Sequence, residues 1–369
     1  MKSAKEGSKP TAGSDASAAA AADELASMSL GGAAPAPANV EDEDEMFCSN
    51  CGKTDKDLKG CNACRCIRYC SASCQKAHWK THKKECRQIE AVLKKGEPRD
   101  GKYYLDLSVQ VDGEDSGLFD EPPKNPDCVV CMVRLPLEPR YSIYHPCCGK
   151  VICSACSRDS AKATYEINQK KAAMKQKLLD STCPFCRERC VNGDDPEWMP
   201  LLIKRAHLGD AVAMRLLAEE YRKQGNIYLS MQLLNASANL GGFVEAQYAY
   251  GCIYAIGALG VEVDEISANR YFELAAKNGH VIARHNLGCS HRQVDGAPSI
   301  SSIKHWRISA AAGSTRSIMS LIAASRFIRH KDLAASLRAR DKARLEMKSE
   351  SRDRLVAFFK STGQLPPVY

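Results

Sequence analysis

The stretch from Cys48 to Cys86 carries residue types that bind metal ions, at spacings that metal sites require. Eight of its residues could serve as ligands: Cys48, Cys51, Cys61, Cys64, Cys70, Cys74, His82 and Cys86. A Cys-x-x-Cys turn brings two sulfurs to one ion, and residues four apart, such as His82 and Cys86, share one face of a helical turn. Eight ligands suffice for two tetrahedral zinc ions with no coordination position left for a substrate, so we expect structural zinc sites.

The residues around these ligands resemble the MYND zinc finger over 46–95. The resemblance rests on Tyr69-Cys70-Ser71, Cys74-Gln75, Trp79, His82 and Cys86. It implies that the ligands interleave, with Cys48, Cys51, Cys70 and Cys74 on one zinc and Cys61, Cys64, His82 and Cys86 on the other. Cys66 and His78 fall outside the pattern, and we expect neither to bind metal. The alternative is a disulfide framework, which we set aside because nothing at the amino terminus marks secretion.

A second set of eight thiols follows a proline-rich boundary. Three Cys-x-x-Cys pairs and one adjacent pair make it up: Cys128 and Cys131, Cys147 and Cys148, Cys153 and Cys156, and Cys183 and Cys186. Their order resembles a RING finger over 128–190, as do the segments Cys148-Gly149-Lys150-Val151-Ile152-Cys153 and Cys183-Pro184-Phe185-Cys186-Arg187.

The second set departs from the common RING at one position. Lys150 stands where that family carries a histidine, and a protonated ammonium cannot bind zinc. An all-cysteine variant that uses Cys147 and Cys148 would avoid the histidine; His145 and Cys190 are spare candidates. The number of zinc ions here stays open between one and two, since adjacent cysteines are strained as a chelating pair. Between Cys156 and Cys183, the Ala-, Lys- and Gln-rich segment 158–179 suits a helix.

Beyond Pro196 the sequence repeats itself with the period of helical-hairpin solenoids. Gly209, Gly242, Gly279 and Gly313 recur at intervals of 33, 37 and 34 residues. Small residues follow each glycine by four positions, and mostly large apolar ones by eight: Ala213, Ala246, Ala283 and Ser317, then Leu217, Tyr250, Leu287 and Leu321. Each unit is expected to be two antiparallel helices, with the glycine ending the second helix. Residues 246–279 resemble Sel-one-like repeats, relatives of the tetratricopeptide class, through Tyr254, Gly257, Gly260-Val261 and Asp264.

The elements combine into a multidomain fold: two small cross-braced zinc-binding modules followed by an all-α helical-hairpin solenoid. We expect a disordered tail at 1–45, the MYND-type finger at 46–95, a linker at 96–127, the RING-like finger at 128–190, Sel-one-like repeats at 197–332, and a carboxyl-terminal capping helix and tail at 333–369. Within the linker, Tyr103–Val111 alternates like a strand. The carboxyl-terminal helix could also bind a partner; the sequence favours neither role.

Composition places this metal chemistry in a reducing compartment. Seventeen of the nineteen cysteines lie between Cys48 and Cys190. We therefore expect an intracellular protein, in the cytoplasm and/or the nucleus, and no segment approaches a membrane span. The formal net charge of +8 omits the negative charge of zinc-bound thiolates. With no base-reading helix or aromatic interleaving either, direct nucleic-acid binding is not expected.

Two functions follow from these modules. The first is a zinc-dependent adaptor whose MYND-type finger binds proline-containing peptides, as its family does, and whose solenoid holds a second protein. The second is a RING-type E3 ubiquitin ligase that uses the repeats as a substrate receptor. The resemblance implies that Val130, Pro184 and Arg187 contact an E2 ubiquitin-conjugating enzyme, with Arg187 orienting the ubiquitin it carries. No nucleophile elbow, phosphate loop or dinucleotide fingerprint points to another reaction.

Overall fold

The computed structural model describes residues 46–55, 57–94, 104–107, 117–293 and 295–363. The predicted amino-terminal tail lies outside the described residues, and so does most of the strand-like segment Tyr103–Val111. The part of that segment that is described, residues 104–107, contains no strand, so the alternation predicted it wrongly there. Leu105 instead donates its backbone N–H to the carbonyl of Phe327 at 2.8 Å.

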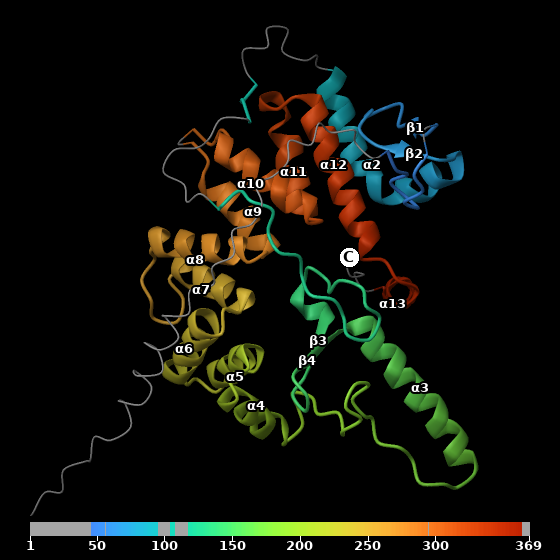
Figure 1. The fold of residues 1–369 in the computed structure, drawn as a ribbon, viewed down its shortest axis with the longest axis vertical. Coiled ribbons are helices and arrows are strands. Elements are labelled where there is room, and N and C mark those ends of the chain that lie inside the picture. The colour runs from blue at the N-terminus through green and yellow to red at the C-terminus, as the bar shows by residue number, and fades with distance from the viewer. Residues whose placement is uncertain (1–45, 56, 95–103, 108–116, 294, 364–369) are drawn as a thin grey trace, which may run out of the picture. The chain divides into compact units, whose positions relative to one another are not determined.

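The first zinc-type module is a two-stranded hairpin beside one long helix. Strands β1 (Lys59–Gly60) and β2 (Arg68–Tyr69) pair antiparallel, and α2 (Ala72–Lys94) follows directly (Figure 1). The helix buries His82, Glu85, Cys86 and Ile89, which share one face because they recur at intervals of three and four residues. The same buried face therefore carries two of the predicted ligands and the apolar contact.

The second module is built in a similar way. After a 3₁₀ turn (Pro139–Tyr141), strands β3 (Ser142–His145) and β4 (Lys150–Cys153) pair antiparallel and lead into α3 (Ser154–Ala173). The helix predicted over 158–179 thus starts four residues earlier, immediately after a ligand, and ends six residues sooner. It ends in a turn where Gln176 donates its N–H to the Lys171 carbonyl at 2.9 Å and Lys175 is left-handed, with φ of 53°.

A series of helix pairs fills most of the remaining chain, and the positions of the repeat glycines predict its register. The helices are α4 (Trp198–His207), α5 (Ala211–Lys223), α6 (Ile227–Asn235) with a π-helical turn (Ala236–Leu240), α7 (Val244–Ile256), α8 (Glu265–Lys277), α9 (Val281–Ser290), α10 (Ile300–Ala311), α11 (Thr315–Ala323) with a 3₁₀ turn (Ser325–Phe327), α12 (His330–Glu346) and α13 (Glu350–Ser361). The first helix of each pair (α5, α7, α9, α11) begins two residues after a repeat glycine, and each of those glycines has a positive φ. The solenoid prediction is confirmed at the level of helical hairpins.

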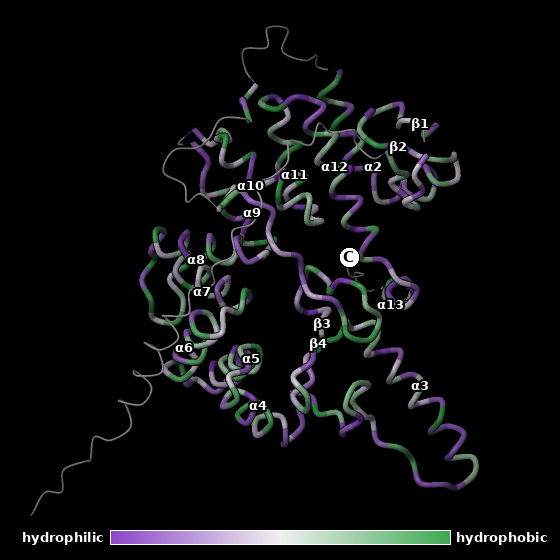
Figure 2. Tube along the Cα trace, in the orientation of Figure 1, coloured by the Kyte–Doolittle hydropathy of each residue, from purple (hydrophilic) through white to green (hydrophobic). Residues whose placement is uncertain are grey.

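Burial explains why the repeat positions have the residues they do. The small residues four after each glycine are completely buried, and the large residues eight after are at most 6% exposed. In Figure 2, hydrophilic and hydrophobic stretches alternate along these helices, as expected for helices that each bury one face. Asp264 begins α8 by accepting hydrogen bonds from the backbone N–H groups of Ile266 and Ser267.

The end of the predicted linker is packed into the solenoid. Leu118 is 1% exposed and lies in a cluster with Phe272 and Leu287, and the buried Arg284 donates to the Leu118 carbonyl at 2.6 Å. The linker passes so close to the backbone of Gly279 that a Cβ there would stand 2.2 Å from the carbonyl oxygen of Pro123. The segment from Gly117 onward is therefore part of the folded body.

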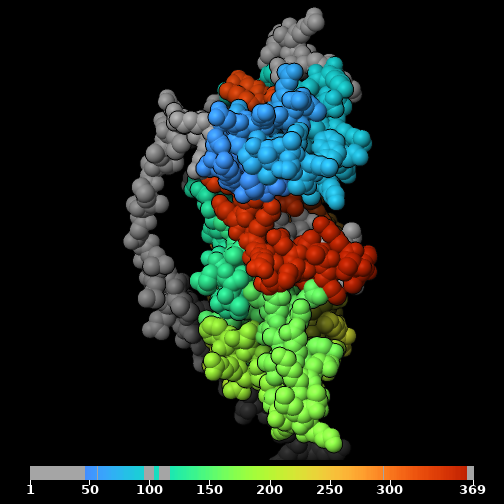
Figure 3. Space-filling view, turned by 90° about the vertical axis from the view of Figure 1, so that its right-hand side faces the viewer, coloured from blue at the N-terminus to red at the C-terminus, as the bar shows by residue number. Residues whose placement is uncertain are grey.

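The carboxyl-terminal helices join the two cysteine-rich modules to the repeats. The predicted boundary at 333 cuts through α12, which packs against α10 and α11 as the second helix of the last pair. One buried cluster contains Ile67 and Ile89 of the first module together with Trp306, Leu321 and Leu337 of the repeat helices. A second cluster joins Cys128 and Ile152 to Met347 and Leu355. Figure 3 shows the carboxyl-terminal helices in red between the first module in blue and the second in green.

Candidate metal centres

The structure gathers the sixteen predicted ligands into four groups of four. In each group the ligand atoms all lie within 4.8 Å of one another. The groups are Cys48, Cys51, Cys70 and Cys74; Cys61, Cys64, His82 and Cys86; Cys128, Cys131, Cys153 and Cys156; and Cys147, Cys148, Cys183 and Cys186. The first module therefore shows the interleaving that the MYND resemblance implied, in which successive ligand pairs belong alternately to one group and the other. The two groups of the second module alternate along the chain in the same way.

Five residues singled out in the sequence stand outside these groups. The thiol of Cys66 donates to the Cys64 carbonyl at 3.1 Å, and His78 hydrogen-bonds through Nδ1 to the Tyr69 hydroxyl at 3.0 Å. His145 is buried in β3, and the backbone N–H of Cys190 donates to the Ser181 carbonyl at 2.8 Å. Lys150 is exposed, and its ammonium lies 5.5 Å from the ring centroid of Phe185.

The distances within the groups suit tetrahedral zinc. Sulfurs bound at about 2.3 Å in a tetrahedron stand about 3.8 Å apart. The sulfur separations are 3.6 Å for Cys51 and Cys70, 3.6 Å for Cys61 and Cys86, 3.9 Å for Cys131 and Cys153, and 3.4 Å for Cys147 and Cys186. The adjacent cysteines Cys147 and Cys148 both enter the fourth group, so their proximity in sequence does not prevent shared coordination.

One turn geometry recurs at four of the Cys-x-x-Cys motifs. In each, the residue after the second cysteine donates its N–H to the carbonyl of the first cysteine at 2.8–2.9 Å and has a positive φ. These residues are Gly52, Arg65, Met132 and Arg187. Three of the four are not glycine, so a positive φ strains their backbones. A metal ion bound to both sulfurs of the turn would supply free energy that compensates for this strain.

The same turns favour thiolates over thiols. Burial raises the pKa of Cys128, but hydrogen bonds from backbone N–H groups, including that of Cys131, outweigh burial and bring the pKa to about 7. Burial also raises the pKa of Cys48 and Cys183, but hydrogen bonds from backbone N–H groups outweigh it and hold the pKa of both below the ordinary value. The hydrogen bond from Cys66 lowers the pKa of Cys64 to about 3. Each group thus contains a sulfur poised to bind a cation as the anion.

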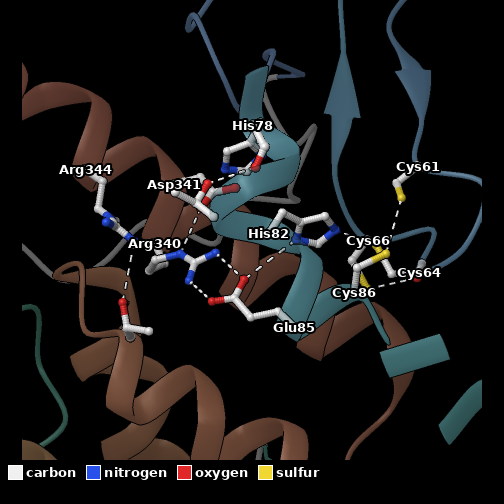
Figure 4. A network of polar contacts seen from close by, with 12 residues as sticks. Cys61, Cys64, Cys66, His78, His82, Glu85, Cys86, Arg340, Asp341 and Arg344 are labelled. Atoms are coloured by element: carbon white, nitrogen blue, oxygen red, sulfur yellow. Dashed lines mark hydrogen bonds and ion pairs between the residues drawn. The ribbon is translucent and has the colours of Figure 1, made fainter. Parts of the chain in front are cut away.

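Two residues that are not ligands, Glu85 and Arg340, surround the histidine of the second ligand group with charge. The sequence did not predict either role. Nε2 of His82 faces the Cys64 sulfur at 3.3 Å, while a carboxylate oxygen of Glu85 lies 3.7 Å from Nδ1 (Figure 4). Arg340 of α12 donates to both oxygens of that carboxylate, at 2.6 and 2.9 Å. Glu85 could have been found from its place one helical turn after His82; nothing in the sequence near Arg340 signals its partner.

Comparison with known proteins identifies the first module. Residues 48–86 match the model of the MYND finger, so this stretch is a MYND finger, a module that binds zinc. SET domain-containing protein 14 of Caenorhabditis elegans is 45% identical over 51 residues, which is 14% of this chain and 12% of that protein. Histone-lysine N-methyltransferase ASHR1 of Arabidopsis thaliana is 44% identical over 50 residues, covering 14% and 10%. Ubiquitin carboxyl-terminal hydrolase 19 of the same plant is 47% identical over 50 residues, covering 13% and 7%. The chain spans about a tenth of the length of these relatives.

A solved structure shares a more distant likeness. The protective antigen c5321 of uropathogenic Escherichia coli, described as displaying an SLR fold, aligns with 45% of this chain and 37% of its own at 25% identity, with a TM-score of 0.33. Among the residues that the structure describes, no helix is both long enough and apolar enough to cross a membrane.

Proposed function

We propose that the chain is a zinc-dependent adaptor that binds a proline-containing, acidic peptide on its MYND finger and a second protein on its helical repeats. The proposal rests on one observation: the solvent-facing side of α2 presents an exposed tryptophan among lysines. Trp79 is 37% exposed there, and the exposed Lys76 and Lys83 lie three and four residues from it on the same face, with the exposed Lys80 beside them.

This face has the chemistry of a peptide site. An exposed indole offers a flat apolar surface and an N–H donor, which suits proline rings and the free carbonyls of an extended peptide. The surrounding ammonium groups favour acidic residues beside the prolines and speed encounter more than they add affinity. Zinc fixes the helix below, so the side chains need little ordering when a partner arrives.

A peptide-binding assay on the full chain tests the proposal. Fluorescent decapeptides containing proline and glutamate should bind the wild type and lose at least tenfold in affinity for Trp79→Ala. Lys59→Ala, a change at an exposed lysine of β1, is the control and should bind like the wild type. Equal binding of proline-free analogues would refute the proposal, as would salt-sensitive binding of duplex DNA at micromolar or tighter affinity in place of peptide binding.

The repeats supply the second surface in this proposal. Stacked helix pairs of this kind form a concave face along their first helices, which suits an extended partner. We assign them to the Sel-one-like class on three residues: Gly257, which ends α7, Asp264, which begins α8, and Gly260 in the turn between them. The adaptor would act in the cytoplasm and/or the nucleus, because its many metal-binding thiols require a reducing compartment.

A ubiquitin ligase is the second candidate, and the second module supplies its support. Its two ligand groups alternate along the chain as in a cross-braced RING. The three residues assigned to E2 contact, Val130, Pro184 and Arg187, are all exposed. The test is discharge of ubiquitin from a panel of E2 enzymes. A ligase requires faster discharge by the wild type than by Arg187→Ala or Val130→Ala, with zinc content unchanged; equal rates for all three would eliminate this candidate.

A further inference from the structure

Helix α12, from a distant part of the chain, makes polar contacts with the ligand-bearing turn of the MYND finger. Nε2 of His330 lies 3.0 Å from the Cys64 carbonyl and 3.2 Å from the Cys66 sulfur. Arg338 donates to the Cys66 carbonyl at 3.3 Å. The turn that positions Cys61 and Cys64 is thus held from outside by two side chains of α12.

The strongest of these contacts is a buried charge cluster. Arg340 is 2% exposed and grips the Glu85 carboxylate with both terminal nitrogens, while its Nε donates to Asp341 at 2.8 Å. Glu85 and Asp341 are 5% and 4% exposed. A fork-to-fork pair of this kind fixes the carboxylate in direction as well as in position.

Glu85 is aimed at a ligand that lacks another partner. His82 is 1% exposed, and its Nδ1 has no hydrogen-bond partner within the described part of the chain. When Nε2 binds a metal, the proton of the neutral ring sits on Nδ1, and this N–H ordinarily donates a hydrogen bond to a carboxylate. The Glu85 oxygen faces Nδ1 at 3.7 Å, just beyond hydrogen-bond distance, so a shift of about 0.5 Å would complete the contact (Figure 4).

We propose that α12 is an outer part of the Cys61, Cys64, His82 and Cys86 zinc site, with Arg340 positioning Glu85 and, through it, His82. Zinc retention at this site and docking of α12 then stabilise each other, because linkage is reciprocal. The coupling concerns this chain's own residues and holds whichever partner the finger binds.

The rival explanation is that Arg340 and Glu85 only join two packed elements. The two explanations predict different rates of metal release. A positioning role makes metal release from one site faster, whereas a packing role changes the stability of the α12 contact and leaves release from the docked finger unchanged.

The experiment measures metal release from the full-length protein. Cobalt replaces zinc, since the one group with a histidine among the four gives a three-thiolate spectrum distinct from the four-thiolate groups. Arg340→Lys keeps the charge but loses the fork, and Glu85→Gln keeps the shape but loses the charge. Both should release the three-thiolate component to a chelator 10–100 times faster than the wild type. Lys331→Ala, an exposed change on the same helix, should release it at the wild-type rate.

A double variant shows whether the effect passes through the histidine. His82→Cys provides a fourth sulfur and removes the Nδ1 link, so all four groups become four-thiolate and the readout is the time course of total zinc release to the chelator. Adding Arg340→Lys to His82→Cys should leave that time course unchanged. Wild-type release rates in both single variants would overturn the proposal. Equal acceleration by Arg340→Lys with and without His82→Cys would overturn it as well, because Arg340 would then affect the site by a route that does not pass through His82.

Discussion

Replacing Gly288 by alanine tests the close packing of α9 against α10. A Cβ at this position would stand 2.4 Å from Nε1 and 2.5 Å from Cδ1 of Trp306. Carbon atoms in contact normally lie about 3.5–4.0 Å apart, so the indole or the helix must move by about 1 Å. Trp306 is completely buried between neighbours and has little room to move.

Two opposing terms set the magnitude for Gly288→Ala. Alanine favours the interior of a helix over glycine by about 1 kcal/mol. Overpacking a tight core costs about 1–3 kcal/mol, and the rigid, buried indole places this site at the upper end. We therefore expect a net loss of about 1–2 kcal/mol, which lowers the Tm by roughly 2–8 °C for a domain of this size.

Thermal and denaturant unfolding followed by circular dichroism measures the effect of Gly288→Ala. Gly193→Ala is the control, because a Cβ there meets no atom within 4 Å. Adding Trp306→Phe should cancel part of the loss, since the smaller ring leaves room for the methyl group. A Tm equal to or above that of the wild type for Gly288→Ala would show that helix propensity, not close approach, decides this position.

Three further outcomes are expected. Plasma mass spectrometry should find four zinc ions per chain and three in Cys147→Ser, whereas an unchanged count would exclude Cys147 as a ligand. Arg352→Met should cost about 3 kcal/mol in urea unfolding because the buried guanidinium donates to the carbonyls of Met347 and Arg134, both at 2.6 Å; a loss below 1 kcal/mol would contradict this. Arg354→Ala on the same helix should cost under about 1 kcal/mol, since its pair with Asp159 is half-exposed. Burial raises the pKa of Asp159, but hydrogen bonds from Ser351 and Arg354 outweigh it and hold the pKa below 3.8. That small contribution should thus be present above pH 3.8 and vanish as the pH falls below it; a difference that persists at pH 2 would refute the assignment.

Local rules predicted much of this structure because local geometry decides it. A Cys-x-x-Cys turn holds two sulfurs near one point whatever surrounds it, and the grouping of the eight ligands in the first module followed from the resemblance to the MYND finger. A glycine that ends a helix does so through its own φ, so Gly242 and Gly279 marked where one helix pair ends, and α7 and α9 each begin two residues later. Helix ends were less accurate where a neighbouring element intervened, as at α3, which starts directly behind Cys153.

The sequence could not predict how the modules join. Separate domains were expected, yet Ile67 and Leu337 share one core and Leu118 lies inside the repeats. Such contacts depend on complementary surfaces hundreds of residues apart, for which no periodicity exists. The pairing of Arg340 with Glu85 is of this kind, and either residue alone reads as an ordinary charged position on a helix.

The shared core also sets an order of events at the ribosome. Glu85 and Arg340 are 255 residues apart, so at 5–20 residues per second the partner of the carboxylate emerges about 13–50 s after it. For most of that interval the apolar side of the finger, including Ile67 and Ile89, lacks the repeat helices α10, α11 and α12 that cover it in the folded protein. A chaperone that shields this side, or early zinc loading, would protect the nascent chain from aggregation. The MYND finger, among the first described elements to be synthesised, is therefore among the last to reach its final packing.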